Sequence, residues 1–134
     1  MNKVAKLIIV DGDNKYLMMR RSGHPVFGND PDLPGGTLED GEVPLQTMVR
    51  EVYEEAGIVI DDAETRLLYA GTDYSSHHAT HYSLYIVTLA QRPAIVMSWE
   101  HSSYEWLTLE VFLEQAKAAN DTYMQMVYHT LEDI

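Results

Sequence analysis

The chain has 134 residues, of which 46% are hydrophobic and 22% charged, and its formal net charge at pH 7 is -12. This length is that of one folded domain, residues 1–134, and the composition excludes a disordered tail or a membrane-spanning protein. The net charge opposes binding to a long nucleic acid, whose phosphates are normally held by Lys and Arg. The sequence therefore predicts a soluble globular domain.

The longest apolar runs, such as residues 7–10 and 84–87, are far shorter than the roughly 18 residues that a membrane helix requires. The first run is expected to be a strand and not a signal peptide, because Asp11 and Gly12 follow it without a small-residue cleavage site. The absence of cysteine excludes disulfides, thiolate metal ligands and cysteine nucleophiles. We expect a cytoplasmic protein.

The chain is expected to alternate between strands and helices. The first two strands form a hairpin around the turn at residues 11–14, where Asp, Gly and Asn tolerate turn geometry. A polar loop, 22–34, then leads to a helix that begins at Pro44 and ends before Gly57. The expected strands are residues 3–10, 15–21, 65–72, 80–90 and 104–107.

Two further helices are expected near the carboxyl end. Thr108 is placed to cap a helix that begins at Leu109 and ends near Asn120, and the last helix covers residues 121–131. Strands before and after a central helix, followed by a helical end, favour an α/β fold of the α+β kind. In such a fold, helices cover both faces of a mixed sheet.

Three glutamates gather on one side of the expected central helix. At about 100° per residue, Glu51, Glu54 and Glu55 share a face beside an apolar one. Like charges four residues apart, as in Glu51 and Glu55, repel each other. Mg²⁺ prefers carboxylate oxygen together with water and substrate phosphates. Taken alone, the cluster is either a solvated helix face or a platform for a metal ion.

The residues around this helix decide between the two. Gly36 is followed after five residues by Glu42, and after seven more by the segment 50–58, Arg-Glu-Val-Tyr-Glu-Glu-Ala-Gly-Ile. This stretch resembles the Nudix box, G-x5-E-x7-R-E-U-x-E-E-x-G-U with U an aliphatic residue, at every specified position. From this resemblance the chain is identified as a MutT-like Nudix hydrolase. The resemblance implies an α/β/α sandwich.

The resemblance also implies roles for the matched residues. Glu51, Glu54 and Glu55 would hold Mg²⁺ or Mn²⁺, and Glu51 is a candidate for orienting or deprotonating the attacking water. Gly35 would offer a metal-binding carbonyl. Arg50, placed among the catalytic residues as well, would pair with Glu42 to hold the loop against the helix. The structural positions of the box are Gly36, Glu42, Arg50 and Gly57.

Outside the box, residues 99–107 resemble a segment in which a loop carries a further glutamate before a strand. Glu100 is therefore a candidate metal ligand or base, against the alternative of an exposed loop carboxylate. Arg20 and Arg21 stand where relatives place a basic residue near the substrate phosphates. Alternation along the strand sends one of them inward and leaves open which. Trp106 is expected to belong to the core.

Residues 73–82 hold three of the six histidines. Because His77, His78 and His81 have no cysteine partners, a polar loop on the substrate side is favoured over a zinc site. Tyr74 lies near the position of a tyrosine in dinucleoside polyphosphate hydrolases of the family, and is a candidate substrate-binding residue. Asp73 stands where the ADP-ribose group usually shows proline, which disfavours that substrate.

The reaction that the resemblance implies is hydrolysis of a diphosphate linkage in a nucleoside diphosphate-X substrate. Nucleoside triphosphates and dinucleoside polyphosphates are favoured over nucleotide sugars. A nucleotide-sensing module on the same fold is the alternative, although such modules commonly have a degraded box. An isomerase of the same fold is disfavoured by the lack of cysteine, and RNA decapping by the lack of a basic track. A homodimer is compatible with the sequence.

Overall fold

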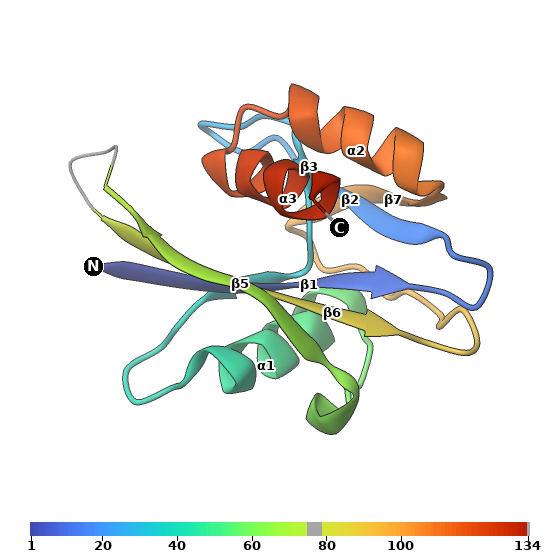
Figure 1. Ribbon diagram of the computed structural model, residues 1–134, viewed down its shortest axis with the longest axis horizontal. Helices are drawn as coiled ribbons and strands as arrows, with labels where there is room; N and C mark the ends of the chain where they lie inside the picture. Colours follow the sequence, from blue (N-terminus) through green and yellow to red (C-terminus); the bar gives the residue numbers. More distant parts are fainter. Residues whose placement is uncertain (75–78, 134) are drawn as a thin grey trace.

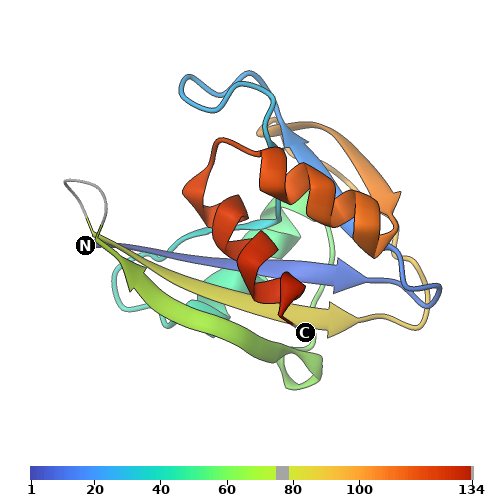
Figure 2. The same ribbon diagram turned by 45° about the horizontal axis from the view of Figure 1, so that its top comes forward.

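The computed structural model describes residues 1–74 and 79–133, and in it a mixed sheet lies between helices (Figure 1). The helices are α1 (Pro44–Ala56), α2 (Leu109–Ala118), α3 (Thr122–Glu132) and a short 3-10 turn at Asp62–Glu64. The strands are β1 (Asn2–Val10), β2 (Tyr16–Arg21), β3 (Pro31–Asp32), β4 (Gly35–Thr37), β5 (Arg66–Asp73), β6 (Thr80–Thr88) and β7 (His101–Leu107). Helix α1 covers one face of the sheet and α2 and α3 cover the other, as Figures 1 and 2 show. The expected α/β/α arrangement is confirmed.

Strand β1 contributes to a hydrophobic core on each face of the sheet. Successive side chains of a strand point to opposite faces, so Leu7 and Ile9 pack in the core that includes α1. Ile8 and Val10 pack in the core that includes α2 and α3. An apolar run without alternation is typical of a strand that is covered on both sides.

The pairing of β1 differs from a simple hairpin. β1 and β2 are antiparallel as expected, but their paired residues are Val10 and Tyr16, close to the turn. The amino-terminal half of β1 pairs instead with β4, at residues 4–6. β2 pairs with β7, and β6 runs parallel to β1 along its whole length. The divergence of β1 and β2 brings the glycines of β4 next to α1.

Most of the expected elements are confirmed, with shifted ends. α1 has the expected bounds, and Gly57 ends it with φ 71°. β7 begins three residues earlier than expected, because the polar residues His101, Ser102 and Ser103 carry no apolar signal yet pair with β2. β6 ends at Thr88 and not at residue 90. The turn at Asp62–Glu64 was not expected.

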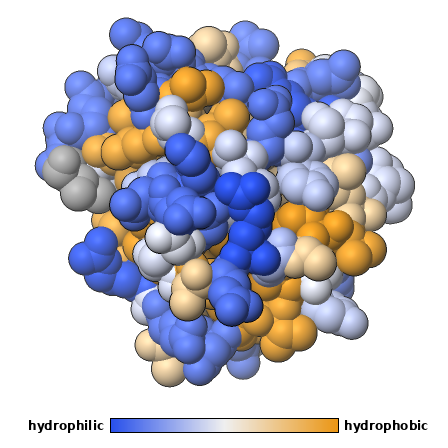
Figure 3. All heavy atoms as spheres, turned by 90° about the vertical axis from the view of Figure 1, so that its right-hand side faces the viewer, coloured by the Kyte–Doolittle hydropathy of each residue, from blue (hydrophilic) through white to orange (hydrophobic). Residues whose placement is uncertain are grey.

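The surface at the β1–β2 turn is mainly polar, with apolar side chains in separate patches (Figure 3). Among the residues that the structure describes, no helix is long and apolar enough to cross a membrane.

Candidate active site

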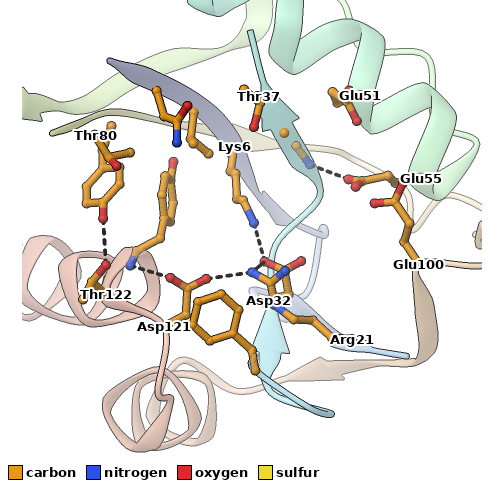
Figure 4. Close-up of a pocket in the computed structure, with 17 residues that line it drawn as sticks. Lys6, Arg21, Asp32, Thr37, Glu51, Glu55, Thr80, Glu100, Asp121 and Thr122 are labelled. Carbon is orange, nitrogen blue, oxygen red and sulfur yellow. Dashed lines mark hydrogen bonds and ion pairs between the residues drawn. The ribbon is translucent and has the colours of Figure 1, made fainter. Parts of the chain in front are cut away.

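A cavity of about 570 Å³ opens between β1, β4, α1 and the beginning of α3 (Figure 4). On one side lie Glu51 and Glu55 from α1 and Glu100 from the segment just before β7. On the other side lie Tyr82 of β6 and Thr122 of α3, whose hydroxyl groups are 2.7 Å apart. The acidic wall and the hydroxyl-bearing wall therefore face a common space.

The carboxyl groups of the acidic wall are held close to one another. Glu55 is buried and accepts a hydrogen bond from the backbone N–H of Gly35 at 2.8 Å. Burial, reinforced by a hydrogen bond with Glu100, raises the pKa of Glu55 to about 9. Burial also raises the pKa of Glu51, and the nearby charges of Glu54 and Glu100 act in the same direction. Negative charge is thus unfavourable on this wall unless a cation compensates for it.

The donors on this wall fit a hard divalent cation. Glu51, Glu55 and Glu100 offer carboxylate oxygens, which Mg²⁺ and Mn²⁺ prefer. Burial is the main cause of the raised pKa of Glu51 and Glu55, and a bound cation would favour their charged forms. Within residues 1–74 and 79–133, no group of three or more acidic or histidine side chains is already arranged to hold a metal ion. The wall supplies suitable ligands, but the side chains of Glu51, Glu55 and Glu100 must change position to bind one ion together.

Two glycines allow β4 to approach both β1 and α1. Gly35 has φ 141°, and a Cβ there would collide with the backbone of Ala5 and Lys6. A Cβ on Gly36 would lie 2.8 Å from Cδ and 2.9 Å from Oε2 of Glu51. The first glycine is required by the backbone, whereas the second leaves room for a carboxylate of the acidic wall.

The expected pairing within the box is present. Arg50 donates to Glu42 from Nε at 2.8 Å and from Nη2 at 2.9 Å. The same carboxylate accepts hydrogen bonds from Thr47 Oγ1 and from the backbone N–H of Glu39. Arg50 Nη1 also lies 2.7 Å from Glu51 Oε1. The pair therefore ties the loop before α1 to the helix and orients a glutamate of the acidic wall.

Three of the expected site residues lie away from the cavity lining. Glu54 has a side chain that is 54% exposed and pairs with Arg50 at 3.1 Å, so it does not join Glu51 and Glu55 on the wall. Arg20 lines a separate pocket beside α2. Tyr74 is exposed and does not line the cavity. The cavity lining thus includes Glu51 and Glu55 but not Glu54 or Tyr74.

The remaining candidate residues occupy different parts of the fold. Arg21 is the arginine that lines the cavity. His81 contacts Thr72 Oγ1 at 3.0 Å, whereas His77 and His78 lie outside the described residues. Trp106 packs against the core on the α1 face, as expected, with the guanidinium of Arg92 over its ring. His101, which follows Glu100, is buried and contacts Asp32.

A buried charge network forms the floor of the cavity, and sequence reasoning missed it. Asp32 accepts from Lys6 Nζ and contacts His101 Nε2 at 2.9 Å and Arg21 Nη2 at 3.3 Å. Arg21 Nη2 also donates to Asp121 at 2.7 Å (Figure 4). Burial alone would raise the pKa of Asp32, but the charges of Lys6 and Arg21 and the bond with His101 bring it well below its ordinary value. The sequence feature that indicates this network is Lys6, because a lysine inside an otherwise apolar run requires a buried partner.

Comparisons with known proteins agree with the fold and the box. The family profile described as NUDIX domain matches residues 1–127. The 8-oxo-dGTP diphosphatase of Proteus vulgaris is 34% identical over 85 residues, which are 63% of this chain and 74% of that protein. Other curated relatives are matched over less than half of their own length. The chain therefore belongs to the NUDIX domain family and is a Nudix hydrolase.

Two solved structures have the same fold. A MutT protein from Methanosarcina mazei Go1 superimposes with a TM-score of 0.80 at 20% identity, over 98% of this chain and 93% of that one. A C. elegans Ap4A hydrolase superimposes with a TM-score of 0.73 at 20% identity, over the full length of both chains. The names of these relatives imply different substrates, so the family does not fix the substrate of this chain.

Proposed function

We propose that the chain hydrolyses a diphosphate linkage in a nucleoside diphosphate-X substrate, with nucleoside triphosphates and dinucleoside polyphosphates as the favoured classes. The reaction adds water across X-P-P-Y to give X-P and P-Y. The observation that carries this proposal is the convergence of Glu51, Glu55 and Glu100 on one cavity beside Gly35 and Gly36. The diphosphatase relative supports the reaction type.

The proposed cofactor is Mg²⁺, with Mn²⁺ as a substitute. When bound, such an ion neutralises phosphate oxygens and lowers the pKa of water. Glu51, Glu55 and Glu100 would be its protein ligands together with the carbonyl of Gly35. Glu54, which is close to them on α1, would complete the set only after its side chain leaves Arg50.

The remaining steps are assigned to residues of the cavity. Glu51 is proposed to orient the attacking water or to accept its proton, with Glu100 as the second candidate for that base. Arg50 keeps Glu51 in place through the hydrogen bond at 2.7 Å. Arg21 lines the cavity and is proposed to bind a substrate phosphate, although its guanidinium is paired with Asp32 and Asp121. The hydroxyl groups of Tyr82 and Thr122, which also line the cavity, are proposed to contact the nucleoside.

Product analysis tests this proposal. The protein would be incubated with nucleoside triphosphates, oxidised nucleotides, dinucleoside polyphosphates and nucleotide sugars, with Mg²⁺ or Mn²⁺ and with an EDTA control. Cleavage of one class between two phosphates, lost with EDTA, is the expected result. Nucleotide binding without cleavage of any compound would contradict the proposal and favour a nucleotide-sensing module.

A further inference from the structure

A second pocket adjoins the proposed active site and shares part of its lining. Its volume is about 400 Å³, and it shares Arg21, Asp32 and Glu100 with the main cavity. Because Glu100 borders both spaces, a molecule held by the glutamates in the main cavity is able to extend into the second pocket.

The wall of this second pocket has an aromatic side chain that the fold does not use. Trp99 lines the pocket and is 84% exposed, whereas Trp106, the other tryptophan of the chain, packs against the core. A large exposed indole gains free energy when a ligand covers it, and it stacks well on planar rings. The position of Trp99 next to Glu100 therefore indicates ligand contact.

The loop between β2 and β3 contributes His24 and Pro25 to the lining of the pocket. His24 Nδ1 accepts hydrogen bonds from the backbone N–H groups of Val26 and Phe27, at 3.0 and 3.1 Å. The His24 backbone also exchanges two hydrogen bonds with Gly28 at 2.8 Å. These bonds hold the loop in one conformation, so the pocket is largely formed before a ligand enters.

The charges of the pocket disfavour a phosphate as its occupant. Among the described residues, Arg21 is the one arginine or lysine that lines it, and it is engaged by Asp32 and Asp121. Glu100 and Asp32 add negative charge to the same lining. A neutral, planar ring that stacks on the indole of Trp99 fits this combination better than an anion does.

We propose that Trp99, together with His24 and Pro25, forms an aromatic subsite. It would bind the group attached to the end of the phosphate chain that is opposite the nucleoside in the main cavity. The preferred substrate then has an aromatic group at each end of its phosphate chain, one in the main cavity and one against Trp99. This inference rests on the proposed function and narrows its substrate class to dinucleoside polyphosphates. Trp99 is a specificity residue that acts through binding.

Kinetics with matched substrates test the inference. Diadenosine tetraphosphate has a second adenosine that ATP lacks, so Trp99→Ala should raise the KM for diadenosine tetraphosphate about tenfold, as expected for loss of one base stack. The kinetic constants for ATP should stay within about twofold. Trp99→Phe should restore most of the loss. Val96→Ala is the matched control, because Val96 is 69% exposed on the same segment and lines neither pocket.

A binding measurement separates this inference from the proposed function. In a Trp106→Phe, Glu55→Gln variant, Trp99 is the one remaining tryptophan, and diadenosine tetraphosphate should quench its fluorescence more strongly than ATP does. Equal quenching by both nucleotides, or an equal effect of Trp99→Ala on both KM values, would overturn the subsite. If the wild-type protein cleaves no compound of the panel above, the proposed function fails, while the quenching experiment still decides the inference.

Discussion

Lys6 and Asp32 form an ion pair at the floor of the cavity, and both side chains are more than nine-tenths buried. Asp32 is also bonded to Arg21 and His101, so this one carboxylate connects β1, β2, β3 and β7. A carboxylate shared by so many partners determines the shape of the floor. The charges of the network balance only while Asp32 is present.

Asp32→Asn should destabilise the fold strongly, because the substitution leaves Lys6 buried without its counter-charge. Removal of one partner of a buried ion pair costs about 3–5 kcal/mol. The measurement is the free energy of unfolding in urea, compared with Asp62→Asn, which changes an exposed aspartate in the Asp62–Glu64 turn. A loss below about 1 kcal/mol would show that the ion pair contributes little.

Gly35 and Gly36 should respond differently to alanine. At Gly35 the new Cβ would meet backbone atoms at φ 141°, so Gly35→Ala should lower the melting temperature markedly. At Gly36 the Cβ would meet the end of the Glu51 side chain, which is able to move. Gly36→Ala should therefore keep a melting temperature near that of the wild type while kcat falls at least about tenfold. Equal loss of stability in both variants would contradict this distinction.

The Glu42–Arg50 pair should make stability depend on pH. The hydrogen bonds from Arg50 are the main reason that the pKa of Glu42 falls from 4.5 to about 2. A carboxyl group whose pKa is lower in the folded state stabilises the fold above its unfolded pKa. That contribution is lost as the pH falls through the folded pKa.

Thermal unfolding at several pH values measures this effect. The difference between the wild type and Glu42→Gln should be full above about pH 4.5 and should disappear as the pH falls towards 2. Glu39→Gln is the control, since Glu39 is exposed and lies 3.7 Å from Arg50. A difference that does not change with pH would show that the pair acts through packing and not through charge.

Much of the fold and of the acidic wall could be predicted from the sequence. Local patterns placed α1 between Pro44 and Gly57, and the resemblance to the Nudix box implied the pairing of Glu42 with Arg50. These relationships depend on one helix and the loop before it, so their geometry follows from positions that are close in the chain. The helix alone did not show that Arg50 would hold Glu54 away from the cavity.

The rest of the site depends on contacts between distant segments. A register shift between Arg20 and Arg21 in the pairing of β2 with β7 breaks the simple alternation of side chains, so periodicity could not tell which arginine lines the cavity. Asp32 and Asp121 are 89 positions apart in the chain and meet through Arg21. Such partners cannot be found by local pattern, although a lysine within the apolar run of β1 indicates that a buried partner exists.

We propose above all that Glu55 takes part in a metal-dependent hydrolytic site. Its most direct test is the rate of diphosphate cleavage as a function of Mg²⁺ concentration in the wild type, in Glu55→Gln and in Glu64→Gln, which alters an exposed glutamate. We predict that Glu55→Gln lowers kcat by at least about 100-fold and requires more Mg²⁺, whereas Glu64→Gln matches the wild type. A wild-type rate and wild-type Mg²⁺ dependence in Glu55→Gln would contradict the assignment of the site.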